Sequence, residues 1–112
     1  MKIAVKARHM TLTDAMRQYV DSKIAKLPRY YDSVLSIEVM LDVEADQPVV
    51  EIRAAARQKH TFVARHRDED LYACVDQCVD KITAQLRRHK DRVRGHRPVP
   101  AEQTATEEPG QE

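Results

Sequence analysis

Glycine and long apolar runs are scarce in this sequence, and their scarcity excludes several classes of protein. Only two glycines occur among the 112 residues, Gly95 and Gly110. Phosphate-cradling loops and the nucleophile elbow of hydrolases both require closely spaced glycines. No apolar run approaches the roughly eighteen residues of a membrane-spanning helix, and the N-terminus lacks the apolar segment of a signal peptide. We therefore expect a cytosolic protein that does not enter a membrane and has no recognisable catalytic motif.

The two cysteines, Cys74 and Cys78, are too few for a disulfide framework. Their spacing would place both thiols on one side of a helix, which is a possible arrangement for two metal ligands. They lie on or beside apolar positions, however, and His60, His66 and His89 are scattered, so no third ligand stands out. We expect both cysteines to pack as small hydrophobic side chains, with no metal and no cofactor.

Alternation of apolar and polar residues predicts four strands, at residues 2–8, 35–44, 50–56 and 60–65. The second has the clearest pattern, and its apolar face is formed by Leu35, Ile37, Val39, Leu41 and Val43. A turn is expected between the second and third strands, at Asp46, Gln47 and Pro48. The third strand places Val50, Ile52, Ala54 and Ala56 on its inward face.

Apolar residues that recur at steps of three and four predict two helices. The first is capped by Thr11 or Thr13 and ends at Pro28. The second runs from Asp70 to Arg97, and acidic residues precede it, where the helix dipole favours negative charge. Its apolar stripe consists of Leu71, Val75, Cys78, Val79, Ile82 and Leu86.

The predicted order of elements is β-α-β-β-β-α, which indicates an α+β fold. The first two strands need a crossover connection, so they are parallel if adjacent, and the remaining strands form an antiparallel meander. Because each strand has one clearly apolar side, both helices must cover the same face of the four-stranded sheet. The expected architecture is a two-layer sandwich similar to a double-stranded-RNA-binding domain.

The second half of the long helix is strongly basic. At about 100° per residue, Lys81, Arg88 and Arg92 lie within about 40° of one another, beside the apolar stripe. Neither Lys81 nor Arg92 has a carboxylate three or four residues away, so no pair within the helix offsets their charge. A solubilising cationic face is one reading of this row, but an anionic partner is the better one. Nucleic acid phosphate is the anion that such a helix is best suited to bind.

Charge is also distributed unevenly along the chain. Residues 1–97 contain 19 bases and 14 acids, a net charge of +5, whereas residues 98–112 contain four acids and no base. We expect residues 1–97 to form one basic domain. Residues 98–112 have no apolar side chain larger than valine or proline and should form a disordered acidic tail.

Several motifs resemble those of the short-form ribosome hibernation promoting factor family, which includes the ribosome-associated inhibitor and was once named after sigma-54 modulation. The long helix begins Asp70-Leu71-Tyr72-Ala73 and ends Arg88-His89-Lys90-Asp91-Arg92. The first helix contains Leu12-Thr13-Asp14-Ala15-Met16-Arg17, and Tyr31-Asp32 follows it. The similarity spans residues 1–97.

This resemblance implies a non-enzymatic, cytoplasmic protein that binds the small ribosomal subunit, with 16S ribosomal RNA and neighbouring ribosomal proteins as its partners. Its expected place is the channel for messenger RNA and the A- and P-site transfer RNAs, where it would inhibit translation in stationary phase or stress. The free protein is expected to be a monomer. The RNA-binding residues expected from the resemblance and from the basic helix are Lys23, Lys26, Lys81, Arg87, Arg88, Lys90, Arg92 and Arg94.

The subtype remains open at this point. The end of the long helix, at Arg88 to Asp91, favours a factor that promotes inactive ribosome dimers, for which a ribosome modulation factor acting with it is an expected partner. The acidic tail favours an inhibitor that silences single ribosomes and opposes dimerisation. A third alternative, from a different class, is a protein-interaction modulator of a sigma factor, which would need an exposed apolar patch.

Overall fold

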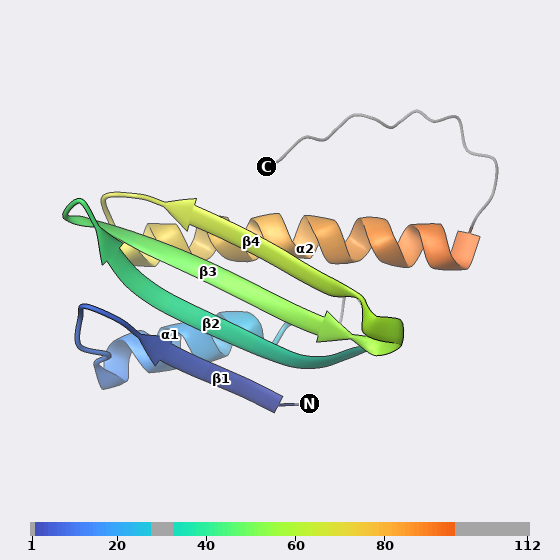
Figure 1. The fold of residues 1–112 in the computed structure, drawn as a ribbon, viewed down its shortest axis with the longest axis horizontal. Coiled ribbons are helices and arrows are strands. Elements are labelled where there is room, and N and C mark those ends of the chain that lie inside the picture. Colours follow the sequence, from blue (N-terminus) through green and yellow to red (C-terminus); the bar gives the residue numbers. More distant parts are fainter. Residues whose placement is uncertain (1, 28–32, 96–112) are drawn as a thin grey trace.

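The computed structural model describes residues 2–27 and 33–95, with only the backbone described for 93–95. The elements follow the predicted order β-α-β-β-β-α (Figure 1). The strands are β1 (Lys2–Ala7), β2 (Val34–Glu44), β3 (Gln47–Ala56) and β4 (Thr61–Arg67). The helices are α1 (Asp14–Ile24) and α2 (Leu71–Gly95), and a short 3₁₀ turn, η2 (Arg57–Lys59), joins β3 to β4.

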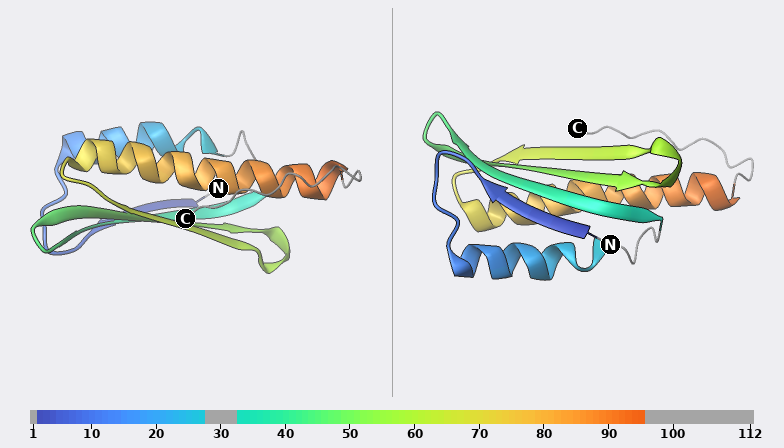
Figure 2. Two further views of the ribbon diagram at one scale, coloured as in Figure 1. Left: turned by 90° about the horizontal axis from the view of Figure 1, so that it is seen from above. Right: turned by 60° about the horizontal axis from the view of Figure 1, so that its bottom comes forward.

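The four strands form one sheet in the order β1-β2-β3-β4. β1 runs parallel to β2, with α1 as the crossover, and β2, β3 and β4 form an antiparallel meander. Both helices lie on the same face of the sheet, as the edge-on view in Figure 2 shows. The predicted two-layer α+β sandwich is therefore confirmed.

One hydrophobic core fills the space between the sheet and the helices. From α2, the apolar stripe contributes Val75, Cys78, Ile82 and Leu86, all of which are buried, together with Cys74. Leu71 and Val79, at the margins of the stripe, are only partly buried and pack against this core. Burial of this stripe, rather than helix propensity alone, holds so long a helix on the sheet.

Side-chain caps fix the N-terminal ends of both helices. The Thr13 hydroxyl accepts a hydrogen bond from the Met16 backbone N–H at 3.2 Å, so Thr13, and not Thr11, is the cap of α1. The Asp70 carboxylate accepts one from the Tyr72 N–H at 3.2 Å, while the Asp70 carbonyl accepts the Cys74 N–H at 2.9 Å. Asp70 is thus the N-cap of α2 rather than its first residue.

Two details of the sheet differ from the sequence prediction. The β2–β3 turn consists of Ala45 and Asp46, with φ of 51° and 64°, and Gln47 and Pro48 already belong to β3. Two consecutive residues with positive φ are typical of a type I′ hairpin, whose twist matches that of the strands. The second difference is a bulge between Val34 and Ser36, which buries Val34 and leaves Leu35 50% exposed on what was predicted to be the apolar face.

The two cysteines occupy the core, as predicted. Both are free and buried, and their thiols donate to backbone carbonyls of the sheet, Cys74 to His66 at 3.0 Å and Cys78 to Ala64 at 3.3 Å. Burial raises the pKa of Cys74 and raises the pKa of Cys78 to about 12. Across the described residues, no group of three or more His, Cys, Asp or Glu side chains is placed to hold a metal ion.

No helix in the described part of the chain has the length and apolar character needed to cross a membrane. The predicted acidic tail, residues 98–112, lies outside the described residues. The boundary expected at residue 97 therefore remains a prediction.

Candidate nucleic-acid-binding surface

The row formed by Lys81, Arg88 and Arg92 lies on the side of α2 that faces the free edge of β4. The ammonium of Lys81 donates a hydrogen bond to the Arg65 carbonyl at 3.0 Å, and the Gln85 amide donates to the Val63 carbonyl at 2.8 Å. These two contacts fix the side of α2 that faces the edge of the sheet. Arg88 and Arg92 continue the row beyond Lys81, and both are exposed.

The charge of this row is not offset within the described residues. None of the ion pairs there includes Lys81, Arg88, Lys90 or Arg92. Lys81 uses one ammonium proton on a carbonyl, which leaves the other two for an anion. A phosphate could therefore bind along this row without displacing a carboxylate.

Lys23 and Lys26 lie on the opposite side of α2, at a groove of about 340 Å³ between the two helices. The groove is lined by Lys23, Lys26, Leu27, Asp76, Val79, Asp80 and Thr83. Because Asp76 and Asp80 line the groove together with the two lysines, its local charge is mixed. The row beside β4, in contrast, consists of bases alone.

A polar cluster at this groove joins α1 to α2. The Tyr19 hydroxyl donates to the Asp76 carboxylate at 2.6 Å, and the Lys23 ammonium lies 3.3 Å from the same carboxylate oxygen and 5.3 Å from the centre of the Tyr19 ring. The hydrogen bond with Asp76 raises the pKa of Lys23 and also that of Tyr19. Lys23 is therefore already paired, whereas Lys26 is exposed and has no ion pair among the described residues.

The eight bases predicted from the sequence do not form one patch. Lys81, Arg88 and Arg92 flank β4, while Lys90 lies on the flank of α2 that contains Val79 and Thr83, toward Lys23 and Lys26. Arg87 is exposed. The side chain of Arg94 lies outside the described residues.

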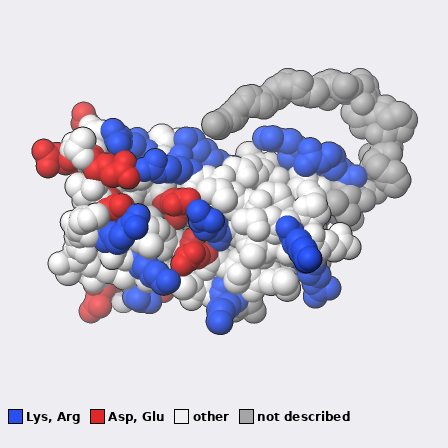
Figure 3. All heavy atoms as spheres, in the orientation of Figure 1, with Lys and Arg blue, Asp and Glu red and all other residues white. Residues whose placement is uncertain are grey.

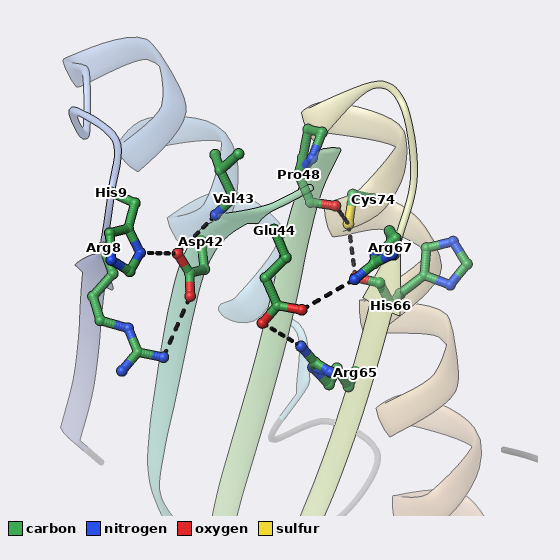
Figure 4. Close-up of polar contacts among 10 residues, drawn as sticks. All are labelled: Arg8, His9, Asp42, Val43, Glu44, Pro48, Arg65, His66, Arg67 and Cys74. Atoms are coloured by element: carbon green, nitrogen blue, oxygen red, sulfur yellow. Dashed lines mark hydrogen bonds and ion pairs between the residues drawn. The ribbon is translucent and has the colours of Figure 1, made fainter. Parts of the chain in front are cut away.

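The face of the sheet away from the helices carries many charges, most of them paired. Figure 4 shows Glu44 between Arg65 and Arg67, at 2.7 Å and 3.1 Å. It also shows Asp42 accepting from the Val43 N–H and lying 2.8 Å from His9 Nδ1. The hydrogen bond with His9, followed by that with Val43, lowers the pKa of Asp42, and the bond with Arg65 lowers that of Glu44.

These pairs were not identified from the sequence, although the strand alternation contained a signal. Positions 65 and 67 share the outer face of β4, and position 44 ends β2 on the same face of the sheet. In Figure 3 the acidic side chains on this face gather toward the end with the β2–β3 turn. Basic side chains without acidic neighbours occupy the opposite end, where η2 lies in Figure 1.

His89 is a packing residue rather than an exposed ligand. It is only 7% exposed, and its ring lies 4.4 Å from that of His60 and 5.1 Å from that of Phe62 between centroids. Burial is the main cause that lowers the pKa of His89, and His60 and Arg92 add to it. The neutral form is therefore favoured in the folded protein.

The fold and the charge pattern together define the class of this protein. It is a small α+β domain with a basic helical surface, a class to which many RNA-binding modules belong. More particularly, residues 3–94 match the Sigma 54 modulation protein / S30EA ribosomal protein family, and the chain belongs to that family.

Two relatives show how far the sequence similarity extends. A ribosome hibernation promoting factor of Azotobacter vinelandii is 33% identical over 103 residues, which cover 88% of this chain and 95% of the relative. The ribosome hibernation promoting factor of Escherichia coli K12 is 30% identical over 96 residues, covering 86% of this chain and all of the relative. Their names, together with the ribosomal protein family to which the chain belongs, agree with the ribosome-associated function that the resemblance implied.

Solved structures agree with this assignment. The N-terminal domain of Thermus thermophilus Protein Y has a TM-score of 0.72 and 33% identity, and the match covers 80% of this chain and 99% of that domain. A ribosomal subunit interface protein from Coxiella burnetii has a TM-score of 0.75 and covers 80% of this chain and 98% of its own. Its identity of 20% supports the fold alone.

Proposed function

We propose that this chain is a ribosome hibernation factor that binds the small ribosomal subunit in the channel for messenger RNA and the A- and P-site transfer RNAs. Binding there excludes messenger RNA and the transfer RNAs, and it inhibits translation in stationary phase or stress. The observation that carries this proposal is the row of Lys81, Arg88 and Arg92 on α2, of which Arg88 and Arg92 are exposed and none is in an ion pair with a described residue. Membership of the family supports the same partner.

The proposed contacts are made mainly to the RNA backbone. Arg88 and Arg92, with Lys81 and Lys90, would bind phosphates, and Arg87, next to Arg88, and Arg94, nearer the end of the helix, would add to them. Lys26 would add a contact from α1, while Lys23 would have to share its ammonium with Asp76. Such contacts position a protein on RNA with little dependence on base sequence, because double-stranded RNA is recognised largely through its shape and backbone.

Sedimentation with purified small subunits at several salt concentrations tests this proposal. We expect the wild-type protein to pellet with the subunits at low salt. The log of its affinity should fall linearly with log salt, by about 0.7–0.9 for each phosphate contacted. Binding that does not change with salt would contradict an electrostatic contact with RNA, and an absence of binding would contradict the function itself.

We further propose that the protein promotes inactive ribosome dimers, acting with a ribosome modulation factor. The relatives named as hibernation promoting factors support this subtype. The acidic residues of the tail, Glu102, Glu107, Glu108 and Glu112, support the alternative of an inhibitor that opposes dimers.

Truncation after Pro100 distinguishes these two subtypes. The tail has the wrong charge to bind RNA, so its removal should leave the affinity for small subunits unchanged or slightly raised at low salt. If the protein promotes dimers, the dimer fraction in gradients that contain the modulation factor should not change. An increase in dimers would show that the tail opposes them, and a loss of binding would contradict both subtypes.

The structure gives little support to a sigma-factor modulator. The large exposed apolar residues among those described are Ile3, Leu35, Val63 and Tyr72. They are spread over four elements, β1, β2, β4 and α2, rather than gathered on one, whereas a protein partner would need a large contiguous apolar patch.

A further inference from the structure

The β3–β4 hairpin ends in a basic tip that the sequence analysis did not identify. The tip consists of Arg57, Gln58, Lys59 and His60, and all four side chains are exposed. A hydrogen bond from the Ala56 N–H to the His60 carbonyl, at 2.8 Å, closes the hairpin below the tip. The Arg57 N–H donates to the Ser33 carbonyl at 3.1 Å, which ties the tip to the start of β2.

The backbone of the tip is unfavourable for its residues. Gln58 and Lys59 have φ of 63° and 64°, in the left-handed region that glycine adopts without a steric cost. The chain places a charged side chain, not glycine, at the second of these positions. Consecutive left-handed residues also form the tight β2–β3 turn at Ala45 and Asp46, so what distinguishes the tip is the charge that it carries.

The tip packs against the basic half of α2. His60 follows Lys59 in the chain, and its ring lies 4.4 Å from the ring of His89, which follows Arg88. Phe62 contacts His89 from the same strand, at 5.1 Å between ring centroids. This ring cluster holds the hairpin tip beside the helical turn that contains Arg88 and Arg92.

The charge of the tip is not offset by the described side chains. None of the ion pairs among them includes Arg57 or Lys59. In Figure 3 the end of the molecule where η2 lies shows basic side chains and no acidic ones on that face. Two separate elements thus present unpaired bases at the same end of the fold.

We propose that Arg57 and Lys59 form a second contact for RNA phosphates, continuous with Arg88 and Arg92 on α2. This inference rests on the proposed function. The additional contact lies on the tip of the β3–β4 hairpin, beside α2 and not on the helix itself. A single row of bases permits the RNA backbone to slide or rotate along it. A second contact on a rigid hairpin fixes the direction in which the backbone crosses the end of α2.

Neutralising the tip tests this inference. In the double variant Arg57→Gln/Lys59→Gln, affinity for small subunits should fall about tenfold or more at physiological salt. The slope of log affinity against log salt should flatten by about 1.4–1.8, the value for two lost phosphate contacts. The matched control is Lys2→Gln/Arg17→Gln, which removes the same charge from exposed positions on β1 and α1 that take part in no ion pair with a described residue. The control should change the affinity less than threefold and leave the slope unaltered.

Lys59→Gly separates binding from folding. Glycine is favoured at this φ, so the melting temperature should stay the same or rise while the affinity for small subunits falls. An affinity equal to that of the wild type would overturn the inference. An Arg57→Gln/Lys59→Gln variant whose affinity equals that of the control would also overturn it. The same holds for a variant that loses affinity with an unchanged salt slope, because the contact would then be with protein and not with RNA phosphate. Both comparisons require a wild type that binds, and its failure to bind at any salt would overturn the proposed function as well.

Discussion

Replacing Arg88 and Arg92 with glutamate is expected to abolish co-sedimentation with small ribosomal subunits while leaving the fold intact. Both side chains are exposed and take part in no ion pair among the described residues, so their replacement breaks no contact that holds the fold. Each substitution removes a proposed phosphate contact and adds repulsion between the new carboxylate and the same phosphate. We expect affinity to fall at least about a hundredfold at physiological salt, with a salt slope flattened by about 1.4–1.8.

The control for this variant is Lys2→Glu/Arg17→Glu, which changes the net charge equally at exposed positions outside α2 that take part in no ion pair with a described residue. Lys81 is best examined separately, as Lys81→Gln, because its ammonium also bonds the Arg65 carbonyl. Circular dichroism and thermal melting should show that both double variants fold as the wild type does. Equal losses of binding in the two variants would mean that net charge, and not the α2 row, determines affinity.

Replacing both Cys74 and Cys78 with alanine is expected to lower the free energy of unfolding by about 1–3 kcal/mol, with ribosome binding preserved. Both residues are buried between α2 and the sheet, and each substitution removes a sulfur atom that contacts the core and a carbonyl. A small domain has only about 5–15 kcal/mol of stability in total, so the loss should be plain in urea or thermal unfolding.

Thiol chemistry provides an independent measurement of the same environment. Burial raises the pKa of both cysteines, to about 12 for Cys78, so the reactive thiolate is scarce in the folded protein near neutral pH. Alkylation should be slow under native conditions and should accelerate in denaturant. Stoichiometric zinc in the purified protein, lost in the alanine variant, would contradict a packing role.

Local patterns in the sequence were sufficient to predict the architecture. Period-two and helical spacing identified all four strands and both helices, and the crossover rule supplied the parallel pairing of β1 with β2. The bulge at Leu35 and the turn at Ala45 and Asp46 were missed. Both depend on how β2 pairs with β3, which the alternation of one strand does not specify.

The candidate surface was predicted less completely, for a similar reason. The helical wheel identified Lys81, Arg88 and Arg92 as one row, but it could not show that this row faces β4 while Lys23 pairs with Asp76 on the other side. Whether a base is available to an anion depends on contacts between elements that are distant in the chain. The basic hairpin tip was overlooked because its proximity to α2 arises from contacts between distant parts of the chain, such as those of His60 and Phe62 with His89.

The hydrogen bonds from Lys81 and Gln85 to the carbonyls of β4 also affect how the protein behaves when it is crowded. β4 is an edge strand, and the unpaired backbone groups of such a strand can recruit a strand from another molecule. Here α2 occupies two of its carbonyls, at Arg65 and Val63, and places a positive charge beside them. Acetylation of Lys81 would remove that charge and weaken the first of these hydrogen bonds. Under the proposed function, the same modification would weaken RNA binding and also make the free edge of β4 more prone to pair with another molecule.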